Sequence, residues 1–180
     1  VMRATMEEVN GVWQGACYPF REGLSTGILN LQFTPEGQLL TGGTNRGWPV
    51  RGARNNVLER LDWTGRTPFE IKEINATPDG FRLTFTKPVD PKRAADPASY
   101  RIQTYTHMYR QAYGSPEVDH TTPSVVSAKV ETNGLSVRLR IDGLVQGHVH
   151  EFDASGLESY EGEPILHSRA YYTLNEIPVQ

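Results

Sequence analysis

Apolar and polar residues alternate with a period of two along much of this sequence, and this pattern restricts the fold more than any other feature. Successive side chains of a β-strand point to opposite faces, so each alternating run forms one apolar stripe backed by polar residues. The pattern predicts half-buried antiparallel strands. The clearest runs are Leu29, Leu31 and Phe33; Phe81, Leu83 and Phe85; Val126, Ala128 and Val130; and Leu135, Val137, Leu139 and Ile141.

Turn-forming residues stand beside these runs, where hairpins would need them. Gly and Asn tolerate the positive φ that tight hairpins demand. A single helical turn is expected within Pro91–Ala98, and no other window has a helical period of adequate length. The sequence therefore predicts an all-β protein. The turn signals are Pro35-Glu36-Gly37, Pro78-Asp79-Gly80 and Asn133-Gly134.

A polar stretch containing Gly and Pro, residues 64–68, predicts a boundary between two units. Residues 1–65 are expected to form a Gly-rich antiparallel β segment that resembles one propeller blade, whose uncovered faces must pack on something else. Residues 66–180 are expected to form an immunoglobulin or fibronectin III-like β-sandwich, because seven short strands over roughly 110 residues are typical of that fold. Those strands are expected at 70–76, 80–86, 99–109, 124–131, 135–141, 148–153 and 170–175.

Charge and composition exclude several classes of function. The formal net charge is −3 and the Lys and Arg residues are scattered, so the basic surface of a nucleic-acid binder is missing. Apolar runs stay shorter than about 10 residues, whereas a membrane-spanning helix needs roughly 20. The single Cys17 provides no internal disulfide and no Cys-x-x-Cys pair for a metal or haem. We therefore expect no nucleic acid partner and no membrane span.

His148 and His150 form the sharpest metal motif in the chain. Residues i and i+2 of a strand point the same way, so this pair could hold zinc or copper with His167, His120 or His107 as a third ligand. Phe152 lies on the same predicted face. The alternative is therefore a core or interface face with hydrogen-bonded histidines.

Two further groups of residues are candidates for ligand binding. Arg46, Trp48 and Arg51 lie in a Gly-rich loop, where an Arg fork could bind carboxylates and a Trp face could bind a sugar or quinone ring. Tyr105 and Tyr109 are expected on one face of a long strand, where they could stack on sugars. In the alternative interpretation, the loop arginines are solvated, the Trp packs under the loop, and the tyrosines cover a neighbouring domain.

Several longer motifs suggest a family. The chain resembles the C-terminal region of large secreted bacterial proteins similar to sorbosone and glucose dehydrogenases, which contain a β-propeller, then a sandwich module, and often a c-type cytochrome. The motifs that carry this resemblance are Trp13-Gln14-Gly15-Ala16-Cys17, Asn45-Arg46-Gly47-Trp48, Leu61-Asp62-Trp63-Thr64-Gly65-Arg66-Thr67-Pro68-Phe69-Glu70-Ile71 and Tyr113-Gly114-Ser115-Pro116-Glu117.

The resemblance implies a non-catalytic accessory module with a bacterial, periplasmic or secreted location. Pyrroloquinoline quinone or haem would belong to the fuller parent protein, a quinone- or haem-linked sugar dehydrogenase, and it stays open whether Arg46 or Arg51 would hold the quinone. The expected partners are other domains of the polypeptide, a polysaccharide, or a second copy that pairs through exposed strand edges. A carbohydrate-binding module and a copper- or zinc-binding sandwich are the two alternatives.

Overall fold

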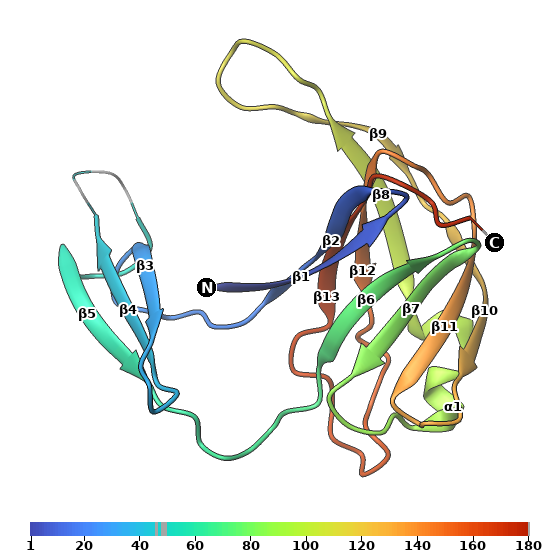
Figure 1. Ribbon diagram of the computed structural model, residues 1–180, viewed down its shortest axis with the longest axis horizontal. Helices are drawn as coiled ribbons and strands as arrows, with labels where there is room; N and C mark the ends of the chain where they lie inside the picture. Colours follow the sequence, from blue (N-terminus) through green and yellow to red (C-terminus); the bar gives the residue numbers. More distant parts are fainter. Residues whose placement is uncertain (46, 48–49, 180) are drawn as a thin grey trace. The chain divides into compact units, whose positions relative to one another are not determined.

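The computed structural model describes residues 1–45, 47 and 50–179 and confirms the predicted all-β class (Figure 1). A short helix α1 (Pro91–Ala94) and a 3-10 turn at Pro97–Ser99 lie where the single helical turn was expected. The strands are β1 (Met2–Val9), β2 (Val12–Pro19), β3 (Ile28–Phe33), β4 (Leu39–Thr44), β5 (Asn56–Leu61), β6 (Ile71–Thr77), β7 (Gly80–Phe85), β8 (Arg101–His107), β9 (Glu117–Thr121), β10 (Ser124–Val130), β11 (Ser136–Asp142), β12 (His148–Asp153) and β13 (Arg169–Leu174).

The chain divides into two compact units. The first, which we call the sheet unit, contains Val1–Met2 and Phe20–Thr67; the second, the sandwich unit, contains Arg3–Pro19 and the chain from Pro68 onward. The division at Thr67 lies close to the expected boundary, but residues 3–19 belong to the sandwich. They do so because β2 pairs with β13 near the other end of the chain, with Ala16 opposite Tyr172.

The sandwich unit consists of two antiparallel sheets. One has the strand order β1-β2-β13-β12-β8-β9 and the other the order β10-β11-β7-β6. Strands such as β7 and β11 bury alternate residues, as the period of two predicts, whereas β9 and β10 contain no fully buried residue. The core is rich in aromatic rings: the Phe81 ring centroid lies 5.0 Å from that of Phe152 and 5.1 Å from that of Tyr172. Further large side chains that are fully buried are Phe69, Phe85, Ile71, Ile74, Leu83, Leu139, Leu157 and Leu174.

Side chains of β1 close one side of the sandwich against β6, the edge strand of the other sheet. The Arg3 guanidinium donates to the backbone carbonyls of Ile71 and Lys72. Glu7 accepts hydrogen bonds from the backbone amide of Ala76 at 2.7 Å and from the buried Tyr172 hydroxyl. Because these bonds use backbone groups of an edge strand, they block further strand pairing there.

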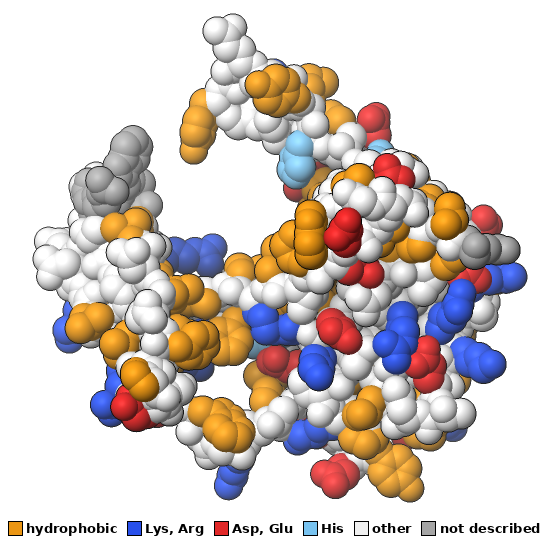
Figure 2. Space-filling model, viewed as in Figure 1, with side chains coloured by type: hydrophobic (Ala, Val, Ile, Leu, Met, Phe, Trp, Pro, Cys, Tyr) orange, Lys and Arg blue, Asp and Glu red, His pale blue; other side chains and the backbone are white. Residues whose placement is uncertain are grey.

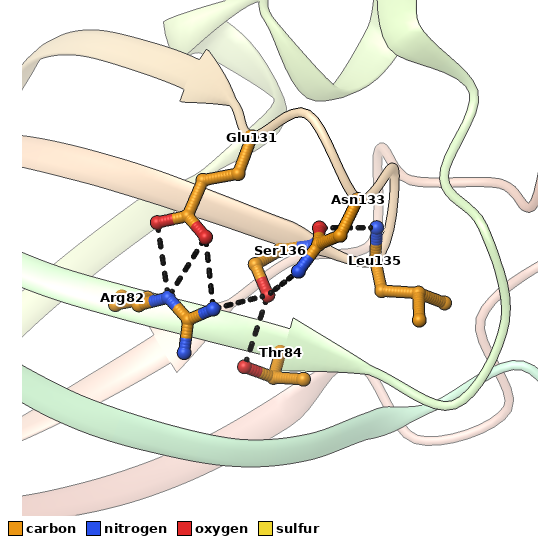
Figure 3. Close-up of polar contacts among 6 residues, drawn as sticks. All are labelled: Arg82, Thr84, Glu131, Asn133, Leu135 and Ser136. Atoms are coloured by element: carbon orange, nitrogen blue, oxygen red, sulfur yellow. Dashed lines mark hydrogen bonds and ion pairs between the residues drawn. The ribbon is translucent and has the colours of Figure 1, made fainter.

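A polar cluster stabilises the β10–β11 hairpin on its outer side (Figure 3). Arg82 binds Glu131 through two guanidinium nitrogens, and its Nη2 also donates to Ser136 Oγ at 3.0 Å. The Arg82 hydrogen bonds lower the pKa of the Glu131 carboxyl. At the predicted Asn133-Gly134 turn, Asn133 Oδ1 accepts from the backbone amides of Leu135 and Ser136. The hairpin register is thus supported by both turn chemistry and an ion pair.

The sheet unit has three strands in the order β3-β4-β5 and very little core. Leu39 is the one buried hydrophobic side chain among its described residues. Thr26 and Thr41 are also buried, and neither hydroxyl has a hydrogen-bond partner within the described chain. An antiparallel sheet of this size needs a cover on its apolar face for stability. Among its described residues, the segment is an antiparallel sheet of three strands, whereas a propeller blade has four.

Candidate interaction surfaces

A long hairpin connection projects from the sandwich between β8 and β9, yellow-green in Figure 1. We call residues 108–116 the arm. Its base is held by the Met108 amide, which donates to the Pro116 carbonyl at 3.0 Å, and by His107 Nδ1, which donates to the Ser115 carbonyl at 3.3 Å. Near the tip, Arg110 Nε donates to the Gly114 carbonyl at 2.8 Å. These bonds give the arm an ordered conformation.

The arm exposes large side chains to solvent. Tyr109 is 99% exposed and Tyr113 is 105% exposed, while Met108 is about half exposed. Tyrosine anchors in protein interfaces are often energetic hot spots, because they combine a large apolar area with a hydroxyl that can bind a partner. Figure 2 shows hydrophobic side chains on this projecting segment. The arm therefore has the chemistry of a contact surface.

Aromatic packing supports the base of the arm. The Tyr105 ring is buried between two histidines, with centroid distances of 5.6 Å to His107 and 5.5 Å to His120. His120 also lies 3.8 Å from the Glu117 carboxylate at the start of β9. The arm thus leaves a rigid part of the six-stranded sheet.

A hollow lies on one face of the sheet unit. We call it the groove and define it by the residues that line it. It has a volume of about 480 Å³. Its floor is Leu39 and Leu61, which are directly paired across β4 and β5. Its aromatic walls are Phe20, Phe33 and Trp63, which are 43%, 64% and 74% exposed. Arg21, Arg60, Asp62 and Thr64 also line the groove. Single exposed apolar residues are normal, whereas several aromatic residues gathered around one hollow are typical of an interaction site.

The strand register separates the groove from the opposite face of the same sheet. Phe33 pairs with Leu39, so both point into the groove. Leu58 pairs with Gly42, which in turn pairs with Asn30, and these positions lie on the other face. Leu58 is itself 73% exposed, so it provides an apolar control outside the groove.

A loop lies against part of the groove face. Glu59 accepts hydrogen bonds from the backbone amide of Ser25 at 3.0 Å and from its hydroxyl at 2.8 Å, which lower the pKa of the Glu59 carboxyl. Gly43 allows the loop to approach, since a Cβ there would lie 2.2 Å from the Gly27 carbonyl oxygen. The loop therefore lies close to the part of this face at Thr41 and Gly43, while Leu31 on the same face remains 47% exposed.

The three histidines of the proposed metal site do not come together. His150 is fully buried, its ring centroid lies 5.1 Å from that of Phe81, and burial lowers its pKa to about 4. His148 Nδ1 lies 3.2 Å from the Thr104 hydroxyl, and His167 Nδ1 lies 2.7 Å from the Glu70 carboxylate. In residues 1–45, 47 and 50–179, no three His, Cys, Asp or Glu side chains lie where they could share a metal ion. His150 lies in the core, but neither of its ring nitrogens has a hydrogen-bond partner within the described chain, unlike the hydrogen-bonded histidine of the alternative interpretation.

The candidate ligand-binding residues are also dispersed. Arg46 and Trp48 lie outside the described residues, and Arg51 is exposed in the same loop, beside a second hollow of the sheet unit. The expected stripe of Tyr105 and Tyr109 is divided, because β8 ends at His107 and the arm turns away. Tyr105 is buried and Tyr109 is exposed. Sequence reasoning missed Phe33 and Trp63 as surface residues, because alternation shows which residues share a face but not whether that face is covered.

Within the described part of the chain, no helix has the length and apolar character required to cross a membrane.

Comparisons with known proteins gave few matches. No family model and no curated protein matches the chain. Among solved structures, domains 1–6 of the surface layer protein SbsC match with 23% identity, a TM-score of 0.46 and coverage of 63% of this chain and 15% of that chain. The N-terminal part of the bacterial S-layer protein SbsC matches with 22% identity, a TM-score of 0.45 and coverage of 63% and 25%. A third SbsC structure, rSbsC(31-844), matches with 26% identity and a TM-score of 0.47.

These findings correct the resemblance to sorbosone and glucose dehydrogenase-like propeller proteins. The matched structures are domains of a bacterial surface layer protein, and no dehydrogenase family model matches. The function drawn from that resemblance, an accessory module of a dehydrogenase-like protein, is withdrawn with it. The chain spans 14 to 25% of the length of the matched chains.

Proposed function

We propose that this chain is a structural and interaction module of a bacterial extracytoplasmic protein. In this proposal, the sandwich unit is a self-sufficient frame, and the sheet unit is an attachment element whose groove is covered by another protein surface. The two parts are continuous in the chain: most of the sheet unit, residues 20–67, lies between β2 and β6 of the sandwich in the sequence.

The observation that carries this proposal is the missing cover of the sheet unit. Its described residues contain one buried hydrophobic side chain, Leu39, while Phe20, Phe33 and Trp63 line a hollow and remain exposed. Burial of apolar surface stabilises a protein by about 25 cal/mol per Å². A sheet that leaves its large side chains in water gains little of this energy, so a further surface is needed to complete it.

Site-specific photo-crosslinking in cells that produce the protein tests this function. A photoreactive amino acid replaces Phe33 in the groove or, as a matched control, Leu58 on the opposite face. We expect position 33 to form a covalent product with a protein surface, whose peptides are then identified by mass spectrometry, and position 58 to form far less. Absence of a protein adduct at position 33, or equal adducts at both positions, would contradict the proposal.

A further inference from the structure

We propose that the groove is filled by the arm of a second copy of this chain, so that copies associate head to tail. This inference rests on the proposed function and specifies the partner of the groove. It joins two surfaces that the structure leaves exposed: the aromatic arm tip at Tyr109 and Tyr113, and the aromatic walls at Phe33 and Trp63. Neither surface belongs to the core of the unit that carries it.

Shape favours a convex partner for the groove. Protein interfaces are stabilised by close packing, and two identical hollows facing each other would enclose empty space. The groove, of about 480 Å³, instead requires a protruding segment with large side chains. The arm is such a segment, and Figure 1 shows that it projects beyond β8 and β9, the two neighbouring strands of the six-stranded sheet that it joins.

The aromatic anchors supply about half of the area that a standard interface buries on each partner. With about 150–250 Å² for each aromatic side chain, Tyr109, Tyr113 and the half-exposed Met108 present on the order of 400 Å² of anchor surface. The groove walls present a similar area. A standard interface buries about 800 Å² on each partner, with an apolar centre and a polar rim. Arg110 and Gln111 on the arm, and the exposed Arg60–Asp62 ion pair beside the groove, can form this rim.

The arm is also prepared for binding. Hydrogen bonds from Met108 and Arg110 within the arm, and from His107 at its base, restrict its backbone before any contact. An ordered segment loses less conformational entropy when it binds, so more of the contact energy contributes to affinity. Because the arm and the groove are different patches, their contact is heterologous and allows open chains of copies or closed rings.

Complementation between two variants tests the inference. The arm variant carries Tyr109→Ser and Tyr113→Ser, and the groove variant carries Phe33→Ser and Trp63→Ser. The native chain is expected to increase in mass with concentration in light scattering, from 20.2 kDa to multiples of it. Each variant alone is expected to be monomeric, with a dissociation constant raised about 30-fold or more for each anchor removed. An equimolar mixture should form dimers only, because one intact arm meets one intact groove.

The controls are exposed apolar residues at other places. Leu58→Ser on the opposite face of the sheet and Tyr160→Ser in a turn of the sandwich, each 73% exposed, should associate like the native chain. Far-ultraviolet circular dichroism should show an unchanged sandwich for every variant.

Three results would overturn the inference. A native chain that stays monomeric at millimolar concentration excludes association. If the groove variant fails to associate while the arm variant still associates, a part of the second copy other than the arm fills the groove. If the mixture of the two variants forms no dimers, an arm-to-groove contact is excluded. In each case the crosslinking experiment at position 33 tests the proposed function independently. If position 33 forms an adduct with a different protein, the proposed function is retained and only the second copy is excluded as the partner.

Discussion

The sandwich unit and the sheet unit contain similar alternating sequences but differ in how their apolar faces are covered. In the sandwich, the stripe of Phe81, Leu83 and Phe85 faces a second sheet and is fully buried. In the sheet unit, the stripe of Leu29, Leu31 and Phe33 is about half exposed or more. The same period of two therefore yields a finished core in one region and a contact surface in the other.

The largest expected difference between the units concerns truncation of a core residue. Phe81→Ala should lower the free energy of unfolding of the sandwich by about 3–5 kcal/mol, because it opens a cavity among closely packed rings. The matched change Leu39→Ala should alter the sandwich transition by less than about 1 kcal/mol, since its paired neighbours Phe33 and Leu61 are in the sheet unit. Urea unfolding measures both, and a larger effect of Leu39→Ala would contradict the division.

Acid should destabilise the sandwich through His150. Its pKa is lowered from 6.5 to about 4 by burial, so between these values the unfolded chain binds a proton that the folded chain does not. The free energy of unfolding should therefore fall by roughly 3 kcal/mol as the pH decreases from 6.5 to about 4. Carboxylates such as Glu131 also contribute in acid, so the test is the difference from a variant.

His150→Leu keeps a similar volume without a titratable ring and should remove that part of the pH dependence. His107→Gln changes an exposed histidine and serves as the control. If urea unfolding of His150→Leu shows the native pH dependence over this range, the assigned cause is wrong.

The side chains between β1 and β6 should contribute a smaller amount. Glu7→Ala leaves the buried Tyr172 hydroxyl and the Ala76 amide without their acceptor, which should cost about 1–3 kcal/mol of sandwich stability. Glu7→Gln retains an acceptor and should cost less. Thermal unfolding of the two variants measures this order, and equal stabilities would show that the hydrogen bonds contribute little.

The smallest expected effect lies in the sheet unit. Glu59→Ala removes the acceptor of both Ser25 hydrogen bonds, so amides of the 23–27 loop should exchange with solvent faster. The sandwich transition should not change, because this contact lies within the sheet unit. A measurable loss of sandwich stability would mean that the two units are energetically coupled.

Local patterns predicted the strands of the sandwich well. The expected ranges 124–131, 135–141 and 148–153 correspond to β10, β11 and β12 within one residue at each end, because alternation and the Asn133-Gly134 turn agree. The short strand β9 was missed, since it has no apolar alternation and Asp119 has a left-handed φ of 58°.

Long-range relationships were not accessible to the same reasoning. The pairing of β2 with β13 joins residues about 155 positions apart, for example Ala16 and Tyr172, and no local signal specifies it. The different environments of Tyr105 and Tyr109 depend on where β8 ends and the arm begins. The groove was not predicted because an apolar stripe looks alike whether its cover lies in the same chain or in another protein.

Hydrogen exchange measured by mass spectrometry on the native chain, at low and high protein concentration, tests the central comparison most directly. We expect amides of β7, β11 and β12 to be strongly protected at both concentrations, because they open only when the sandwich unfolds. Amides of β3, β4 and β5 should exchange rapidly in dilute monomer and become protected as copies associate. Protection of β3–β5 equal to that of the sandwich in dilute monomer would contradict the account, since it would show that the sheet unit needs no other surface.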